Sequence, residues 1–260
     1  MPTALVTGAT AGLGRAFTRV LAEQGYDLVL VARSDVDLKE RAEELHAAYG
    51  TRTEIVPADL TTDDGCAAVT ARIKAEPSID LLVNNAGIGY ERPFLATGID
   101  AEERLLDLNV RAVLRLTDAA LSVMTARHSG AVLNVASVAG LGPAWLSSTY
   151  PASKAWIIAF TESLASSNQV RSADVKMTAL LPGYTRTEFH QRAGIPTTFP
   201  PAWLWLDAER VVRTALNDLA AGKVLSVPSV RYKVAAWGLR HLPRSVSRLV
   251  AWDISAAAPS

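Results

Sequence analysis

Seven short apolar runs, separated by longer amphipathic stretches, constrain the fold of this chain most strongly. The runs predict strands at Thr3–Val6, Leu28–Val31, Glu54–Val56, Asp80–Val83, Ala131–Val135, Lys176–Leu180 and Val224–Val227. Helices are predicted at Arg15–Gln24, Val36–Tyr49, Asp100–Arg127 with Asp100 as its N-cap, Ser153–Asn168 and Asp207–Ala221. Strands that are apolar on both faces and alternate with helices form a parallel sheet with helices on both sides. The sequence therefore predicts a doubly wound α/β domain with a seven-stranded parallel sheet.

The character of the chain changes toward its end. We expect residues 1–228 to form one domain, which includes an irregular apolar loop at about 185–206 rich in proline and aromatic residues. Residues 229–260 are predicted to be a basic amphipathic tail that packs on the same domain, because arginine and lysine alternate there with Trp and Leu. The alternative is weak contact of residues 229–252 with a membrane surface. Pro228 and Pro243 interrupt any single long helix.

Composition excludes several classes of partner. The 26 basic residues balance the 26 acidic ones, so nothing favours nucleic acid as a ligand. Cys66 is the single cysteine, and the four histidines, His46, His128, His190 and His241, lack the spacing of metal ligands, so no disulfide and no metal site are expected. The chain has neither a run of 18 apolar residues nor a basic, cleavable leader. We therefore expect a cytoplasmic protein.

A glycine-rich turn follows the first predicted strand. It reads Thr7-Gly8-Ala9-Thr10-Ala11-Gly12-Leu13-Gly14 and leads into a helix. Glycines at such a turn let the backbone approach a pyrophosphate, and the N–H groups of the helix N-terminus attract its charge. The alternative is a plain glycine turn, but the position between strand and helix favours a Rossmann-type dinucleotide site. The expected contacts are Gly8, Thr10, Gly12, Leu13 and Gly14.

The end of the second strand indicates which dinucleotide binds. An acidic residue there would bond the ribose 2′-hydroxyl of NAD, whereas this chain has Arg33 and Ser34. A guanidinium matches a 2′-phosphate in charge and geometry, so the sequence predicts NADP(H). The alternative is that Arg33 is a solvated surface residue. After the third strand, Asp59 and Leu60 are expected to contact adenine, with a loop cap as the alternative for Asp59.

Tyr150 and Lys154 form the candidate chemical site. Their i, i+4 spacing at the start of a predicted helix places both on one face. A nearby ammonium favours the phenolate and so lowers the pKa of a tyrosine, which otherwise is too high for proton transfer at neutral pH. Ser137 follows the fifth strand, where its hydroxyl can bond a substrate oxygen. A Tyr-x-x-x-Lys pair alone is usually an ordinary surface pair, so its meaning depends on the neighbouring motifs.

The motifs together resemble one family. Thr7-Gly8-x-x-x-Gly12-x-Gly14, Asn84-Asn85-Ala86-Gly87, Asn109, Ser137, Tyr150-x-x-x-Lys154 and Pro182-Gly183 occur in this order. In this combination the chain resembles a single-domain short-chain dehydrogenase/reductase over roughly residues 3–190. An arginine directly after the second strand resembles the NADP-preferring members. Those members usually have a basic residue directly before the second glycine of the motif, whereas this chain has Ala11 there. The expected preference for NADP(H) therefore rests mainly on Arg33.

The resemblance also implies residue roles. Tyr150 would be the acid/base, Lys154 would lower its pKa and hold the ribose, and Ser137 would orient the carbonyl. Asn109 would maintain a water-linked proton relay to Lys154. The alternative is that Asn109 is simply a buried amide whose hydrogen bonds are satisfied within the protein. The remaining expected cofactor contacts are Asn85, Ala86 and Gly87 near the adenine ribose, and Pro182, Gly183 and Thr185 at the nicotinamide amide.

The same resemblance suggests substrate and assembly. The expected substrate wall is apolar and aromatic, and consists of Leu141, Pro143, Trp145, Tyr184, Phe189, Phe199, Trp203 and Trp205. We therefore expect interconversion of a medium or large apolar ketone and its alcohol. The alternative is a non-enzymatic NADP(H)-binding sensor on the same fold. A homodimer or homotetramer is expected, with Leu105, Leu108, Leu116, Trp156 and Phe160 contributing apolar surface.

Overall fold

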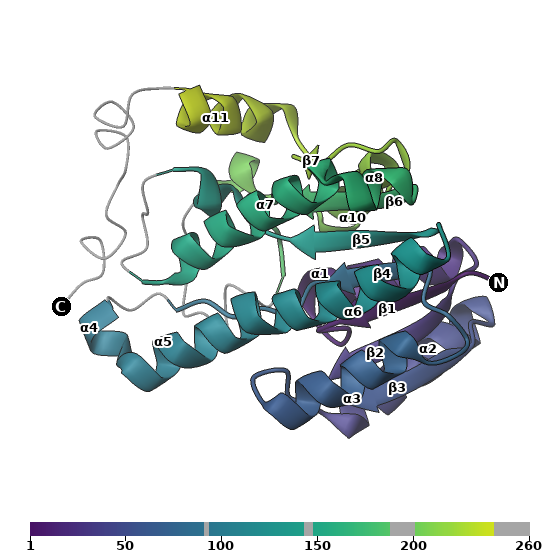
Figure 1. Ribbon diagram of the computed structural model, residues 1–260. Coiled ribbons are helices and arrows are strands. Elements are labelled where there is room, and N and C mark those ends of the chain that lie inside the picture. The colour runs from purple at the N-terminus through teal and green to yellow at the C-terminus, as the bar shows by residue number, and fades with distance from the viewer. Residues whose placement is uncertain (91–93, 143–147, 188–200, 242–260) are drawn as a thin grey trace.

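A parallel sheet of seven strands forms the centre of the molecule (Figure 1). The computed structural model describes residues 1–90, 94–142, 148–187 and 201–241. The strands are β1 (Thr3–Thr7), β2 (Asp27–Ala32), β3 (Thr53–Pro57), β4 (Leu81–Asn84), β5 (Gly130–Val135), β6 (Val175–Leu180) and β7 (Leu225–Ser226). Their order within the described residues is β3-β2-β1-β4-β5-β6-β7, and each neighbouring pair is parallel. The predicted doubly wound sheet is confirmed.

Helices cover both faces of this sheet. One face carries α1 (Gly12–Glu23), α2 (Asp35–Tyr49) and α10 (Ala208–Ala220), and the other carries α3 (Asp63–Lys74), α6 (Val113–Ala126), α7 (Tyr150–Ser166) and α8 (Asn168–Ser172). Successive strand residues point to opposite faces, so Leu28 and Leu30 of β2 join the first core whereas Val29 and Val31 join the second. Burial on both sides explains why the strands read as continuous apolar runs.

The helix boundaries differ from the prediction in several places, and α1 begins at Gly12 instead of Arg15. The stretch predicted at Asp100–Arg127 consists of α5 (Ile99–Leu106), a π-helical turn at Asp107–Ala112 and α6. Gly98, not Asp100, is the N-cap of α5, and no side chain caps that end. Helix α7 begins at Tyr150 instead of Ser153, and α3 was not predicted at all. Between β3 and β4, α3 buries mainly Cys66, Val69 and Ile73.

Two short elements lie near the end of the described chain. The turn η3 spans Ala202–Leu204, and α11 spans Val230–His241 along the edge of the molecule near α7 (Figure 1). Tyr232 and Ala236 of α11 are buried, whereas Val230, Val234 and Trp237 are exposed. Residues 242–260 of the expected tail lie outside the described part. No described helix is long and apolar enough to cross a membrane.

The residues predicted to contribute apolar surface for assembly do not all lie at the surface. Leu105 and Leu116 are fully buried within the subunit, so they cannot touch a second copy. Trp156 and Phe160 stack on each other with ring centroids 4.5 Å apart and are partly buried. Leu106 and Leu114 are instead exposed on the same helical stretch. Leu106 directly follows Leu105, and Leu114 lies two residues before Leu116. Leu108, the third expected leucine, is partly exposed, so the helical stretch presents one of the expected leucines together with Leu106 and Leu114.

Candidate active site

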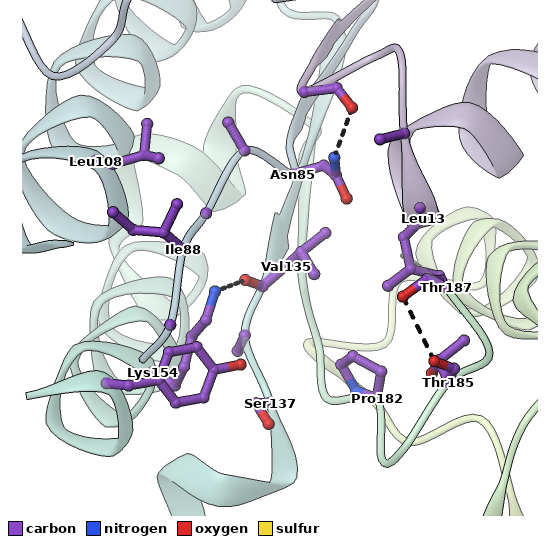
Figure 2. Close-up of a pocket in the computed structure, with 18 of the residues that line it drawn as sticks. Leu13, Asn85, Ile88, Leu108, Val135, Ser137, Lys154, Pro182, Thr185 and Thr187 are labelled. Carbon is purple, nitrogen blue, oxygen red and sulfur yellow. Dashed lines mark hydrogen bonds between the residues drawn. The ribbon is translucent and has the colours of Figure 1, made fainter. Parts of the chain in front are cut away.

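The carboxyl ends of the strands border one large cavity, with a volume of about 860 Å³. The sheet order reverses between β1 and β4, and ligands bind at such a switch point in open α/β sheets. All the predicted site residues line the cavity except Gly14 and Asn109; they are Gly8, Thr10, Gly12, Leu13, Arg33, Ser34, Asp59, Leu60, Asn85, Ala86, Gly87, Ser137, Tyr150, Lys154, Pro182, Gly183 and Thr185. Figure 2 shows Leu13 and Thr187 on one side of this space and Lys154 on another.

The glycine-rich turn has the geometry that a dinucleotide requires. Gly8 and Gly12 have φ of 65° and 54°, which L side chains rarely adopt. A Cβ on Gly14 would lie 1.9 Å from the carbonyl oxygen of Gly8, so only glycine lets α1 begin this close to β1. The N-cap of α1 is Ala11, whose side chain makes no capping hydrogen bond. The turn and the α1 N-terminus therefore fit a pyrophosphate, with Gly14 acting through packing.

Asn84 and Asn85 tie the central strands together beneath this turn. Asn85 donates from its side chain to the Thr7 carbonyl oxygen at 2.8 Å and to the Gly8 carbonyl oxygen at 3.4 Å. Asn84 is buried and donates to the Asn134 side-chain oxygen at 2.9 Å and to the Thr117 hydroxyl at 3.1 Å. These bonds join β4 to β1, β5 and α6. They hold the Ala86–Gly87 backbone at the edge of the cavity.

The end of β2 carries both favourable and unfavourable charge for a 2′-phosphate. Arg33 is exposed and lines the cavity, and Ser34 caps α2 by accepting a hydrogen bond from the Asp37 N–H at 3.2 Å. Asp37 lines the same cavity, so its carboxylate opposes an added phosphate. Asp35 lies in the first turn of α2 and pairs with Lys39 at 2.6 Å.

Asp59 is both a loop cap and a cavity residue. Its Oδ1 accepts hydrogen bonds from the Thr61 N–H at 3.0 Å and from the Thr61 hydroxyl at 2.7 Å. Its Oδ2 pairs with Arg104 at 2.9 Å. Burial raises the pKa of Asp59, but the hydrogen bonds from Thr61 and Arg104 outweigh it and leave the pKa below its usual range. The carboxylate is thus engaged within the protein while it borders the cavity beside Leu60.

Asn109 lies in the π-helical turn and is fully buried. Its Oδ1 accepts from the Ile88 N–H at 2.9 Å, and its Nδ2 donates to the Ile88 carbonyl oxygen at 2.9 Å and to the Ser153 hydroxyl at 3.2 Å. A Cβ on Gly87 would lie 3.1 Å from Asn109 Oδ1 and 3.4 Å from Lys154 Nζ. The Asn109 amide therefore fixes the backbone beside Lys154, and its hydrogen bonds are made within the protein. Such π-turns are frequent at functional sites.

Helix α7 brings Tyr150 and Lys154 into the cavity. Its N-cap, Thr149, donates its backbone N–H at 3.0 Å to the carboxylate of the buried Glu102 on α5, which fixes where α7 begins. Lys154 is buried, and its Nζ donates to the Val135 carbonyl oxygen at the end of β5 at 2.8 Å (Figure 2). The first turn of α7 and the end of β5 thus meet at one point.

Burial controls the proton affinities of both side chains. It raises the pKa of Tyr150 to about 12, while hydrogen bonding with Ser137 acts in the opposite direction. Burial also lowers the pKa of Lys154 to about 8. Each shift has the sign expected when a charged form loses water. The expected net lowering of the Tyr150 pKa by Lys154 is not found here, because desolvation is the largest cause.

The substrate side differs from the expected aromatic wall. Tyr184 lines the cavity, whereas Leu141, Trp203 and Trp205 are not among its described lining residues. Trp203 is 62% exposed, and Trp205 packs against Tyr184 with ring centroids 5.8 Å apart. The expected contacts Pro143, Trp145, Phe189 and Phe199 lie outside the described residues.

Several lining residues were missed from the sequence, among them Ile88, Gly89, Tyr90, Arg104, Leu108, Val138, Ala139, Gly142, Thr187 and Leu239. Ile88–Tyr90 directly follow the Asn84–Gly87 motif, and Val138–Ala139 directly follow Ser137, so continuation of each motif was an available signal. Leu239 had no such signal, because it lies in α11 far along the chain. Among the described residues no group of three or more His, Cys, Asp or Glu side chains is placed to hold a metal.

Comparison with known proteins identifies relatives with this arrangement. The sequence profile of the short chain dehydrogenase family matches residues 2–195. A short-chain dehydrogenase from Sphingobium yanoikuyae in complex with NADPH is 33% identical, with a TM-score of 0.84 over 94% of this chain and 97% of that one. A bulky-bulky ketone specific alcohol dehydrogenase from Comamonas testosteroni is 28% identical, with a TM-score of 0.79 over 94% and 99%.

Curated relatives show a similar likeness in sequence. The very-long-chain 3-oxoacyl-CoA reductase of Bos taurus is 29% identical over 220 residues, which are 83% of this chain and 68% of the relative. Since the family profile covers most of the chain, and the fold and motif positions agree with it, this protein is an oxidoreductase of the short-chain dehydrogenase/reductase family, whose members use a nicotinamide cofactor.

Proposed function

We propose that this protein is an NADPH-dependent ketone reductase, with Tyr150 as the proton donor. The observation that carries the proposal is that Tyr150, Ser137 and Lys154 line the same cavity as the glycine-rich turn. A dinucleotide bound at that turn would therefore share the cavity with the Tyr150 and Ser137 hydroxyl groups. The chain's relatives, which include a reductase and a ketone-specific alcohol dehydrogenase, support this reaction class.

The residues around the cavity suit NADP(H). The Gly8–Gly14 turn would take the pyrophosphate, Asp59, Leu60 and the Asn85–Gly87 backbone would border the adenosine, and Pro182, Gly183 and Thr185 would border the nicotinamide. Arg33 and Ser34 would bind the 2′-phosphate, with Arg33 supplying the charge. When bound there, the reduced nicotinamide supplies hydride to the carbonyl carbon. Everything else in the reaction is proton handling and positioning by the chain itself.

Tyr150 is suited to give a proton in the reducing direction. With a pKa raised to about 12 by burial, it holds its proton throughout the neutral range. Negative charge that develops on the substrate oxygen as hydride arrives would draw this proton, and the Ser137 hydroxyl would hydrogen-bond the same oxygen. Lys154, whose Nζ is fixed by the Val135 carbonyl, would stabilise the resulting phenolate and bond the ribose.

Asn109 would act one step further away. It holds both backbone groups of Ile88, and this fixes the segment that lies beside Lys154 Nζ. By the family resemblance, a water-linked proton relay would run from Lys154 past Asn109. The direct role that the contacts support is positioning.

The substrate is proposed to be a medium or large apolar ketone. The described lining beyond the tetrad is largely apolar, with Ile88, Val138, Ala139 and Leu239. The ketone and 3-oxoacyl substrates named for relatives point the same way. The assembly is proposed to be a homodimer or homotetramer.

A screen tests the proposal directly. Ketones of increasing size are incubated with NADPH or NADH while the absorbance of the reduced nicotinamide is followed, with Tyr150→Phe as the matched inactive control. We expect turnover with NADPH that is lost in the control. Tight NADPH binding without turnover of any carbonyl compound or alcohol would favour the alternative, a non-enzymatic NADP(H)-binding sensor.

A further inference from the structure

Helix α11 lies against two glycines at the edge of the cavity. Gly142 follows β5 and the short η2 helix (Val138–Leu141), and Gly183 follows β6; both line the cavity. A Cβ on Gly183 would lie 2.0 Å from Cζ of Tyr232, and a Cβ on Gly142 would lie 2.7 Å from Cδ2 of Leu239. Two side chains of α11 thus fill the space that two glycines leave open. Tyr232 and Leu239 are seven residues apart, about two helical turns, so they share one face of α11.

Tyr232 fastens this face by hydrogen bonds as well as by packing. Its hydroxyl accepts from the Tyr184 N–H at 3.1 Å and donates to the Leu204 carbonyl oxygen at 3.0 Å. Tyr184 in turn accepts at its carbonyl oxygen from the Leu206 N–H at 2.8 Å. One phenol therefore joins α11 to the segment after β6 and to the segment that leads into α10.

The other end of α11 is attached to the helix that carries Tyr150 and Lys154. Arg240 donates from Nη2 to Oε1 of Glu162 on α7 at 2.9 Å. Leu239, next to Arg240 in the chain, lines the cavity. Its position is thus set by Tyr232 two turns before it and by the Arg240–Glu162 pair directly after it. The opposite face of α11, with Val230 and Val234, is exposed at 77% and 66%.

We infer that Leu239 is a specificity-determining residue whose isobutyl group limits the size of the ketone that the cavity admits, and that Tyr232 positions it. This inference rests on the proposed function in one respect, namely that the cavity takes a carbonyl substrate. Leu239 lies against Gly142, in the segment that follows Ser137, and it lines the same cavity as Ser137 and Tyr150. Shortening Leu239 enlarges that space, and lengthening it reduces the space.

The test uses Leu239→Ala and Leu239→Phe, with Val234→Ala as the matched control on the exposed face of the same helix. Acetophenone, butyrophenone and benzophenone serve as a ladder of increasing bulk. Turnover with NADPH is measured for each, and the affinity of the same ketones for the NADP⁺-saturated protein is measured in parallel by calorimetry. One added or removed methylene in an apolar pocket changes discrimination by roughly 10-fold or more.

We expect Leu239→Ala to favour benzophenone over acetophenone by at least about 10-fold relative to the unmodified chain, and Leu239→Phe to shift the ladder oppositely. Val234→Ala should leave the ladder unchanged. The inference is overturned if Leu239→Ala changes turnover of all three ketones by one common factor. It is also overturned if Leu239→Ala changes the preference among them no more than Val234→Ala does. Ketone binding that shifts as expected without any turnover supports the inference while it refutes the proposed reaction. If no ketone binds the unmodified chain, both are refuted.

A second pair of variants tests the contact itself. The backbone at Gly142 is extended, with φ −135° and ψ −177°, so alanine is tolerated there except for its contact with the end of the Leu239 side chain. Gly142→Ala should therefore change the ladder in the unmodified chain and change it several-fold less in the Leu239→Ala chain. Equal effects in both backgrounds would show that the two positions are not coupled. Tyr232→Phe keeps the ring on Gly183 and removes both hydrogen bonds, and it should raise KM for the ketones more than it lowers kcat.

Discussion

The ammonium group of Lys154 lies 5.6 Å from the centre of the Tyr150 ring, one turn back on the same helix. The lysine is held by the Val135 carbonyl oxygen, so its place relative to the ring is set by β5 as well as by α7. Both groups are buried, which makes the neutral form of each more favourable than in water. The Tyr150 phenol thus keeps a proton that it can donate, and the neighbouring Lys154 ammonium can stabilise the phenolate that remains.

The pH dependence of reduction is the first prediction. Lys154 carries its charge below its pKa of about 8 and loses it above that value. Since the ammonium would stabilise the phenolate left by proton donation, kcat/KM for ketone reduction should fall as pH rises through about 8. Measuring kcat/KM from pH 6 to 10 under saturating NADPH checks this. In Lys154→Met, turnover should be low throughout and this descending limb absent; an unchanged limb in the variant would assign it to another group.

The Ser137 hydroxyl is the subject of the second prediction. Ser137→Ala removes a group that both contacts Tyr150 and would bond the substrate oxygen. Loss of one hydrogen-bond donor to a developing oxyanion commonly lowers kcat by about 10²–10³-fold. NADPH affinity, measured by fluorescence titration, should change little. A variant with normal kcat and weakened NADPH binding would contradict the assigned role.

Cofactor preference gives the third prediction. Hydrogen bonds to charged groups contribute about 1.5–3 kcal/mol, so Arg33→Asp should weaken NADPH by roughly 10- to 100-fold and improve NADH in relative terms. Arg52→Asp is the control for charge reversal, because Arg52 precedes β3 at the amino ends of the strands and its side chain is 76% exposed. If the unmodified protein binds NADH as tightly as NADPH, the interpretation of Arg33 is wrong.

Asp37 provides the complementary prediction at the same end of the cavity. Its carboxylate borders the space assigned to the 2′-phosphate, so Asp37→Asn should strengthen NADPH binding and leave NADH binding nearly constant. Titration of both cofactors at low ionic strength makes the difference largest, because salt screens exposed charges. Equal changes for the two cofactors would show that Asp37 does not face the phosphate.

Much of this arrangement could be predicted because it depends on local sequence. The strands are apolar on both faces, and the i, i+4 spacing places Tyr150 and Lys154 on one face wherever the helix lies. Helix α3 was missed although Cys66, Val69 and Ile73 recur at a helical period, because the stretch has few large apolar residues and includes Gly65. A Cβ on Gly65 would lie 2.1 Å from the Asp59 carbonyl oxygen, so close packing of the chain requires glycine there.

The parts that could not be predicted depend on contacts between distant segments. The π-turn at Asn109 accompanies the bonds of that side chain to Ile88, and no local pattern announces it. The placement of Leu239 depends on Gly142, which is nearly a hundred residues earlier in the chain. The pKa of Tyr150 followed burial and not the neighbouring charge, because spacing reveals proximity but not the loss of water.

Tyr150→Phe is the last prediction and the most decisive. The change keeps the ring and removes only the hydroxyl, so the fold and the cofactor site should persist. Reduction then lacks its proton donor, and turnover should fall by at least about 10²-fold, the usual scale for a general acid. Steady-state rates with the best ketone of the screen, together with NADPH titration, measure both quantities.

Combination of the variants makes this test stronger. If Tyr150, Ser137 and Lys154 act as one unit, the triple variant should be little slower than Tyr150→Phe alone, since residues that act together are strongly non-additive. Additive losses would mean that each residue contributes by itself, for example through binding. Near-normal turnover in Tyr150→Phe would refute the mechanism while leaving the fold and the family intact, because those rest on the sheet order and the motif positions and not on the phenol.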